Sequence, residues 1–173
     1  RQMVFVKGEA GIGKTTLAQF FAARAGTRGA RVLWGRSGGR EGSPPYWPWA
    51  EALRAFAEEV SSDKVRTLFA PGATYLSFVL PELRQSRLFD RASVPDDTSV
   101  RFRVADAVRA LFQRAVQRRP ILLVLEDLHW ADQGSLFLLE FMAQETSATS
   151  LLVLATYREG EVPPQLVRAL GEL

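Results

Sequence analysis

The fold of this chain is decided by one stretch of sequence, Gly8-Glu9-Ala10-Gly11-Ile12-Gly13-Lys14-Thr15. It fits the pattern G-x-x-x-x-G-K-[ST], in which a glycine-rich loop directs successive backbone N–H groups at the phosphates of a nucleotide. An apolar run at residues 3–6 precedes the loop, as a buried parallel strand requires. Helix-forming residues 16–24 follow it. We therefore predict a phosphate-binding loop between a strand and a helix, and a chain that binds a nucleoside diphosphate or triphosphate.

The residue types in the loop predict how it binds the phosphates. Lys14 is expected to reach the β- and γ-phosphates, and the Thr15 hydroxyl to ligate Mg²⁺. The helix that follows carries an apolar stripe at Leu17, Phe20 and Phe21. The predicted cofactors are ATP or ADP with Mg²⁺. The predicted nucleotide-binding residues are Gly8, Glu9, Ala10, Gly11, Ile12, Gly13, Lys14, Thr15 and Thr16.

Composition limits the remaining possibilities. The chain has 173 residues, enough for one domain, with 47% hydrophobic and 24% charged residues, which is ordinary for a globular protein. It contains no cysteine, so disulfides, thiolate metal sites and cysteine nucleophiles are excluded. No apolar stretch reaches the ~18 residues of a membrane span, and there is no signal-peptide pattern. We therefore expect no membrane contact and a cytoplasmic location.

The chain has a formal net charge of +3, and most of its basic residues are arginines that are scattered along the sequence. A basic balance can indicate nucleic-acid binding, but these arginines lie along expected helices and are not interleaved with exposed aromatic residues. We interpret them as solvated helix faces and expect no direct nucleic-acid binding. They include Arg101, Arg103, Arg109, Arg114 and Arg118.

Strands and helices are expected to alternate along the chain. Short apolar runs at residues 31–34, 121–125 and 151–155 are further strands, and the last two are unbroken enough to be covered on both faces. Helical spacing appears from about Trp47, from about residue 100 to Arg119, and at residues 136–142, the last with Asp132 and Ser135 as candidate caps. Residues 37–119 are expected to be a helical insertion. The pattern predicts an α/β fold with three layers, α/β/α, around a parallel sheet.

Polar residues at the ends of the two later strands are the candidates for chemistry. Ligands of such sheets bind beyond the carboxyl ends of the strands, where Glu126, Asp127 and Arg158 are expected to meet the loop. One carboxylate would face Mg²⁺ and the other would polarise the attacking water, and either residue could take either role. The predicted catalytic residues are Asp127, Glu126, Lys14 and Arg158, and the predicted metal ligands are Thr15, Glu126 and Asp127.

Other residues near these strand ends leave two interpretations open. Thr156 is either a hydrogen-bond donor at the phosphates or simply a strand residue. His129, the single histidine, is more often structural than catalytic, and we expect Trp130 to pack. The aromatic segment at residues 46–49 is either a stacking surface or the packed start of a helix, and we favour packing.

The quoted segments resemble one family. That family is the AAA-related STAND group of signalling ATPases. The similar segments are the loop, Trp34-Gly35-Arg36, Pro44-Pro45-Tyr46-Trp47-Pro48-Trp49, Leu125-Glu126-Asp127-Leu128-His129-Trp130-Ala131-Asp132 and Leu154-Ala155-Thr156-Tyr157-Arg158. The similar branch occurs in large LuxR-type transcriptional regulators and some bacterial adenylate or guanylate cyclases. The resemblance implies a P-loop NTPase with a parallel sheet of order 5-1-4-3-2. In it, residues 8–16 are the Walker A loop, Glu126 and Asp127 the Walker B acids, and Arg158 the sensor-1 residue.

The resemblance also implies a function. Members act as slow ATPase switches that are closed with ADP and open or oligomeric with ATP. The sequence opens almost directly into a strand and ends before the fifth strand and the lid helices of the family. We therefore expect residues 1–173 to be a nucleotide-binding domain from a longer chain. The alternatives are a scaffold that holds nucleotide without hydrolysing it and a phosphotransferase acting on a small molecule.

Overall fold

A computed structural model gives the fold. It describes residues 3–38, 44–85, 99–145, 150–162 and 164–171. Four parallel strands form one sheet in the order β1-β4-β3-β2. These strands are β1 (Met3–Gly8), β2 (Arg31–Arg36), β3 (Ile121–Glu126) and β4 (Leu151–Arg158). The α/β class and the parallel sheet are confirmed, and the observed order corresponds to the 1-4-3-2 part of the order that the resemblance implies.

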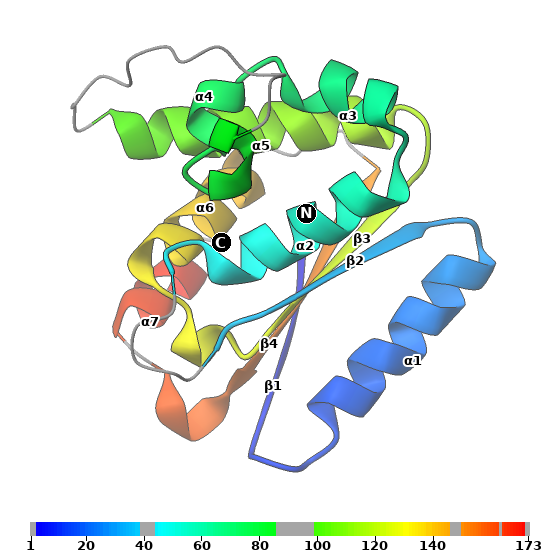
Figure 1. Ribbon diagram of the computed structural model, residues 1–173. Helices are drawn as coiled ribbons and strands as arrows, with labels where there is room; N and C mark the ends of the chain where they lie inside the picture. Colours follow the sequence, from blue (N-terminus) through cyan, green and yellow to red (C-terminus); the bar gives the residue numbers. More distant parts are fainter. Residues whose placement is uncertain (1–2, 39–43, 86–98, 146–149, 163, 172–173) are drawn as a thin grey trace.

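The topology decides which helices cover which face of the sheet. The chain crosses from β1 past β4 and β3 to reach β2, and the later connections then run back in the opposite direction. Because such crossovers are right-handed, the first connection and the later ones lie on opposite faces. Figure 1 shows α1 (Lys14–Thr27) on one side of the sheet and the other helices on the opposite side. Those helices are α2 (Trp47–Glu59), α3 (Ser62–Phe69), α4 (Ala73–Leu76), α5 (Val100–Val116), α6 (Gln133–Glu145) and α7 (Pro164–Gly171).

Short 3-10 turns complete the described elements. They are η1 (Pro81–Gln85), η2 (Leu128–Trp130) and η3 (Glu159–Glu161). Between β2 and β3 the structure describes α2, α3, α4, η1 and α5, while residues 39–43 and 86–98 of the expected insertion lie outside the described residues. Within the described part of the chain, no helix has the length and apolar character to cross a membrane.

The two faces of the sheet carry cores of very different size. The larger core joins the strands to α2, α5 and α6, and β3 is buried at every position. Trp49 is fully buried there, with its ring edge-on to Phe112 and its indole nitrogen donating to the carbonyl of Ser135 at 3.1 Å. The aromatic segment at residues 46–49 thus contributes to core packing, as favoured above. The smaller core lies under α1 and has Ala18 and Ala22 as its buried helix residues.

The apolar stripe of α1 does not face the core. Leu17, Phe20 and Phe21 are 50%, 65% and 44% exposed, whereas Ala18 is fully buried. Helical spacing identifies an apolar stripe but not which neighbour covers it. Here alanine methyl groups face the strands, so the larger side chains lie beside the sheet and not beneath the helix.

Two element ends differ from the sequence expectation. β2 continues to Arg36, two residues past the apolar run, because its last residues stay paired with β3. α6 begins at Gln133, since the carboxylate of Asp132 accepts a hydrogen bond from the backbone N–H of Ser135 at 3.0 Å. Asp132 is therefore the cap, and Ser135 lies inside the helix.

Candidate functional site

The glycine-rich loop connects the carboxyl end of β1 to the first turn of α1. Gly11 and Gly13 have φ values of +77° and +102°, a region that side chains with a Cβ rarely adopt. Gly13 is the residue before the first helical residue, Lys14, so the loop turns directly into the helix N-terminus. Unpaired N–H groups at that end and the helix dipole both favour an anion.

A cavity of about 300 Å³ gathers most of the predicted residues. Asp127 from the end of β3 and Arg158 from the end of β4 line it opposite the loop. The remaining lining residues are Ala10, Gly11, Gly13, Lys14, Thr15 and Thr16. Residues separated by more than a hundred positions in the sequence therefore meet at one edge of the sheet. Gly8, Glu9, Ile12 and Glu126 are the predicted site residues that do not line this cavity.

The side chain of Lys14 folds back on its own loop. Its Nζ donates to the carbonyl oxygens of Gly8 at 2.9 Å and Glu9 at 2.7 Å. Gly8 and Glu9 thus contribute backbone acceptors to the site, while the side chain of Ile12 is 69% exposed. A lysine held by neutral carbonyl oxygens can exchange them for phosphate oxygens, because the ammonium group is attracted more strongly to an anionic acceptor than to a neutral one.

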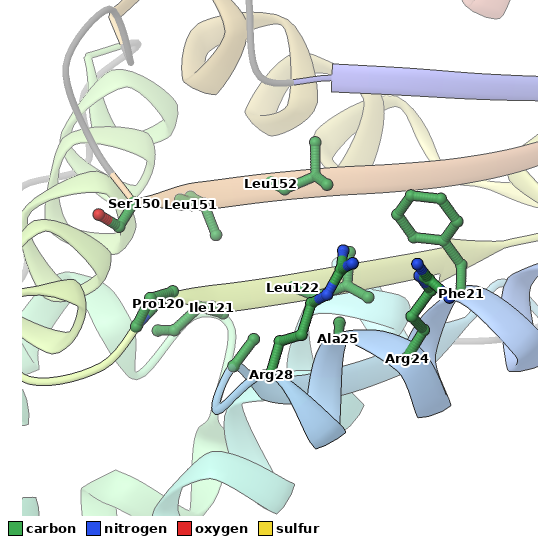
Figure 2. Close-up of a pocket in the computed structure, with 11 residues that line it drawn as sticks. Phe21, Arg24, Ala25, Arg28, Pro120, Ile121, Leu122, Ser150, Leu151 and Leu152 are labelled. Atoms are coloured by element: carbon green, nitrogen blue, oxygen red, sulfur yellow. The ribbon is translucent and has the colours of Figure 1, made fainter.

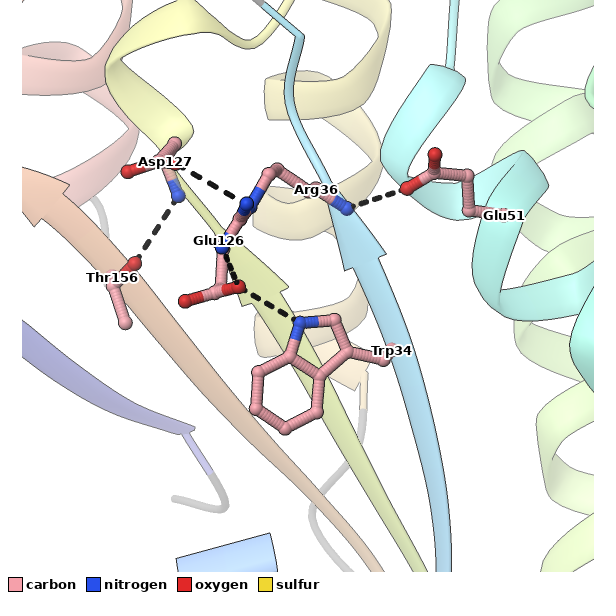
Figure 3. A network of polar contacts seen from close by, with 6 residues as sticks. All are labelled: Trp34, Arg36, Glu51, Glu126, Asp127 and Thr156. Carbon is pink, nitrogen blue, oxygen red and sulfur yellow. Dashed lines mark hydrogen bonds and ion pairs between the residues drawn. The ribbon is translucent and has the colours of Figure 1, made fainter. Parts of the chain in front are cut away.

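Glu126 is a buried carboxylate held by residues of β2. It is 1% exposed, and its Oε2 accepts hydrogen bonds from Trp34 Nε1 at 2.9 Å and from an Arg36 terminal nitrogen at 2.7 Å (Figure 3). Its Oε1 is buried and has no hydrogen-bond partner among the described residues. Burying a charge is costly unless it is paired and hydrogen-bonded, which explains why two donors meet this side chain.

Arg36 bridges both acidic residues. Its Nε lies 3.6 Å from an Asp127 carboxylate oxygen, and its backbone N–H donates to a Glu51 carboxylate oxygen of α2 at 2.8 Å (Figure 3). The hydrogen bond to Glu126 raises the pKa of Arg36 above its ordinary value, although partial burial opposes this. The guanidinium therefore stays charged and fixes the relative placement of the two acids.

Asp127 adopts a left-handed backbone conformation, with φ of 58°. Its backbone N–H donates to Thr156 Oγ1 at 3.1 Å. Asp and Asn are among the few residues that tolerate this conformation, and such outliers concentrate at functional sites. Thr156 is 1% exposed, so its hydroxyl here fixes the backbone of Asp127.

The donor set fits a hydrated Mg²⁺ ion. Mg²⁺ is usually held by one or two carboxylates together with substrate phosphates and several waters. Among the residues that the structure describes, no group of three or more His, Asp or Glu residues could hold a metal by itself. Thr15 and Asp127 line the cavity and supply a hydroxyl and a carboxylate, whereas Glu126 does not line it. The residues present therefore suit Mg²⁺ held jointly with a nucleotide.

His129 and Trp130 do not line the cavity. His129 is buried and its ring lies 5.3 Å from that of Trp130, between centroids. Trp130 is 49% exposed, so the expectation that it packs is correct only for the side that meets His129. η2 is a single short turn, which leaves the outer side of this ring in solvent.

Trp34 and Arg36 are the residues that sequence reasoning missed as members of the site. The sequence signal was incomplete: Arg36 is the last residue of its strand, as Glu126 is, but this position does not reveal which residue it faces. In the structure, Arg36 pairs in register with Glu126 on the neighbouring strand. The pairing of β2 with β3 was needed to place these opposite charges together.

The sequence matches a known protein family over most of its length. The family model described as AAA ATPase domain matches residues 1–154. The chain therefore belongs to the AAA ATPase domain family, a class of nucleotide-binding ATPase domains. No curated protein is a significant match to this sequence.

Proposed function

We propose that this chain is the ATP-binding, slowly hydrolysing switch module of a larger cytoplasmic signalling or transcriptional regulator of the STAND type. The observation that carries the proposal is the cavity in which loop residues face both Asp127 and Arg158. This arrangement joins a phosphate cradle, a carboxylate and a cation, which are the groups that γ-phosphate hydrolysis requires. The switch role and possible self-association in the ATP state are proposed from the resemblance to STAND ATPases.

Each residue has a proposed role. The loop amides and Lys14 bind the phosphates, and Thr15 and an acidic residue hold Mg²⁺, which neutralises phosphate charge when bound. Asp127 orients the attacking water, and Arg158 senses the γ-phosphate by a charge-assisted contact. Glu126 is the acid that lies behind Asp127, held through Oε2, with Oε1 directed to no protein donor among the described residues.

Binding is tested with the Lys14→Ala variant. Losing a charge-assisted contact costs ~1.5–3 kcal/mol, so the Kd for MgATP should rise by about tenfold or more. Isothermal titration calorimetry measures it. Lys64→Ala removes an exposed lysine of α3 and serves as the control, with unchanged affinity expected. Equal MgATP affinity in the Lys14→Ala variant and the unaltered chain would refute the assignment of the loop.

Hydrolysis is tested with the Asp127→Asn variant, in which asparagine retains the tolerance for the left-handed backbone. We expect loss of phosphate release with MgATP affinity changed by no more than roughly threefold, since one water-orienting group is removed. The control is Asp63→Asn in the first turn of α3. If phosphate release continues at the original rate, Asp127 has no part in the mechanism. If the unaltered chain binds MgATP but releases no phosphate, the chain is the non-hydrolysing scaffold.

A further inference from the structure

A second and larger cavity lies on the α1 side of the sheet, at the opposite end of the strands from the phosphate loop. Its volume is about 570 Å³, within the range of small-molecule sites. Leu122 of β3 and Leu152 of β4 form its floor, and the last turns of α1 form its wall. This site shares no lining residue with the cavity of the phosphate loop.

Two arginines line this cavity together with Phe21, Arg24 in the last turns of α1 and Arg28 directly after its last residue. They are four residues apart, a spacing that places two side chains on the same side of a helix. Figure 2 shows both side chains rising from α1 toward the strands, on the same side of the helix as Phe21. The Leu17 and Phe20 side chains continue this exposed face toward the phosphate loop.

The two guanidinium groups have no acidic counterpart in the part of the chain that the structure describes. The described ion pairs involve other basic residues, and the nearest basic neighbour in the sequence, Arg31, pairs with Glu59. Cations near a helix C-terminus interact favourably with the helix dipole. That interaction does not require both side chains to point over an apolar floor. Two like charges side by side are stabilised by an anion that binds between them.

We infer that this cavity binds a small amphipathic carboxylate, with its head between Arg24 and Arg28 and its alkyl body over Leu122 and Leu152. Guanidinium groups match the geometry of a carboxylate. The apolar floor removes the surface of the alkyl chain from water, which favours binding. The concave shape and limited volume fit a single small molecule. This inference is independent of the proposed ATPase function, since it uses none of the same residues.

The test uses decanoate as the probe, with the intact chain in isothermal titration calorimetry. Acetate supplies the head alone, and decyltrimethylammonium supplies the tail with the opposite charge. We expect saturable binding of decanoate, and no measurable binding of the other two at the same concentrations. Chemical-shift changes should appear at the methyl groups of Leu122 and Leu152 and not at the Thr15 methyl group.

The double variant Arg24→Gln/Arg28→Gln should weaken decanoate binding by about tenfold or more. Arg66→Gln/Arg118→Gln removes two exposed arginines elsewhere, keeps the same net charge as the double variant, and should leave the Kd within roughly twofold. MgATP affinity should be unchanged in both, which also verifies that they fold. If the double variant does not fold, the single Arg28→Gln variant is measured in its place, with a smaller loss expected.

Three outcomes would overturn the inference. One is equal decanoate affinity in the folded arginine variant and the unaltered chain. Another is equal binding of the cationic amphiphile, which would show that only the apolar floor matters. The third is binding of an acidic amphipathic peptide with no binding of decanoate, which would assign the surface to a protein partner.

Discussion

Glu126 lies inside the molecule, where donors from a neighbouring strand meet one of its oxygens. Trp34 and Arg36 both bond to Oε2, and Arg36 also approaches Asp127. The side chain of Arg36 is 53% exposed, so water weakens its electrostatic contribution, whereas Glu126 is shielded from water. The acid that lines the cavity and the acid behind it are thus positioned by the same guanidinium.

The Arg36→Gln variant tests this role. Removing one partner of a buried charge destabilises the fold, but half-exposure of Arg36 limits the loss to about 1–3 kcal/mol in the free energy of unfolding. Urea denaturation measures it. Arg54→Gln breaks an exposed pair with Glu82 and should cost under about 1 kcal/mol. Equal losses in the two variants would mean that Glu126 does not depend on Arg36.

Residues of the site differ in how far the sequence predicts them. The loop is a local motif, so Lys14 and Thr15 were identified without knowledge of the fold. Asp127 and Arg158 were predicted to meet the loop because each comes after an apolar run and strand ends share an edge in a parallel sheet, and both line the cavity. Arg36 could not be found in this way, because its role depends on the register between β2 and β3.

At the scale of elements, β2 and the start of α2 are packed backbone against backbone. A Cβ atom added to Gly35 would lie 1.8 Å from the backbone oxygen of Pro48, and no flexible side chain there can move aside. Glu51 of the same helix accepts a hydrogen bond from the backbone of Arg36. This contact therefore fixes both the approach of α2 and the end of the strand that carries Arg36.

We predict that Gly35→Ala lowers the free energy of unfolding by about 1–3 kcal/mol or more, because backbone must shift to admit the methyl group. Gly26→Ala is the matched control. Its added Cβ meets nothing within 4 Å inside α1, so it should stabilise the chain by about 0.5–1 kcal/mol. Thermal denaturation compares the two. If Gly35→Ala left the free energy of unfolding unchanged, α2 and β2 would not be closely packed.

The elements themselves were largely predictable, but their packing was not. Unbroken apolar runs located β3 and β4, since strands covered on both faces have no polar alternation. The apolar stripe of α1 was correctly identified but lies in solvent for the most part. Periodicity reports which side chains share a face, whereas burial depends on what the remainder of the chain places against it.

At the scale of the whole molecule, nucleotide binding should raise the free energy of unfolding. A ligand that binds only the native state stabilises it by RT ln(1 + [L]/Kd), which is about 2.7 kcal/mol at a ligand concentration 100-fold above Kd. We expect MgATP to raise the denaturation midpoint of the unaltered chain by this mechanism. The Lys14→Ala variant at the same MgATP concentration should lose most of the gain, and Lys64→Ala should keep it. An identical midpoint with and without MgATP would contradict nucleotide binding by this chain.

The position of α1 has a mechanical consequence. The helix has 14 residues, about 21 Å at 1.5 Å per residue, with Lys14 at one end and Arg28 just past the other. Its buried attachment to the sheet consists of two methyl groups, those of Ala18 and Ala22. Because a helix of this length is stiff, any tilt that displaced Lys14 would also displace Arg28.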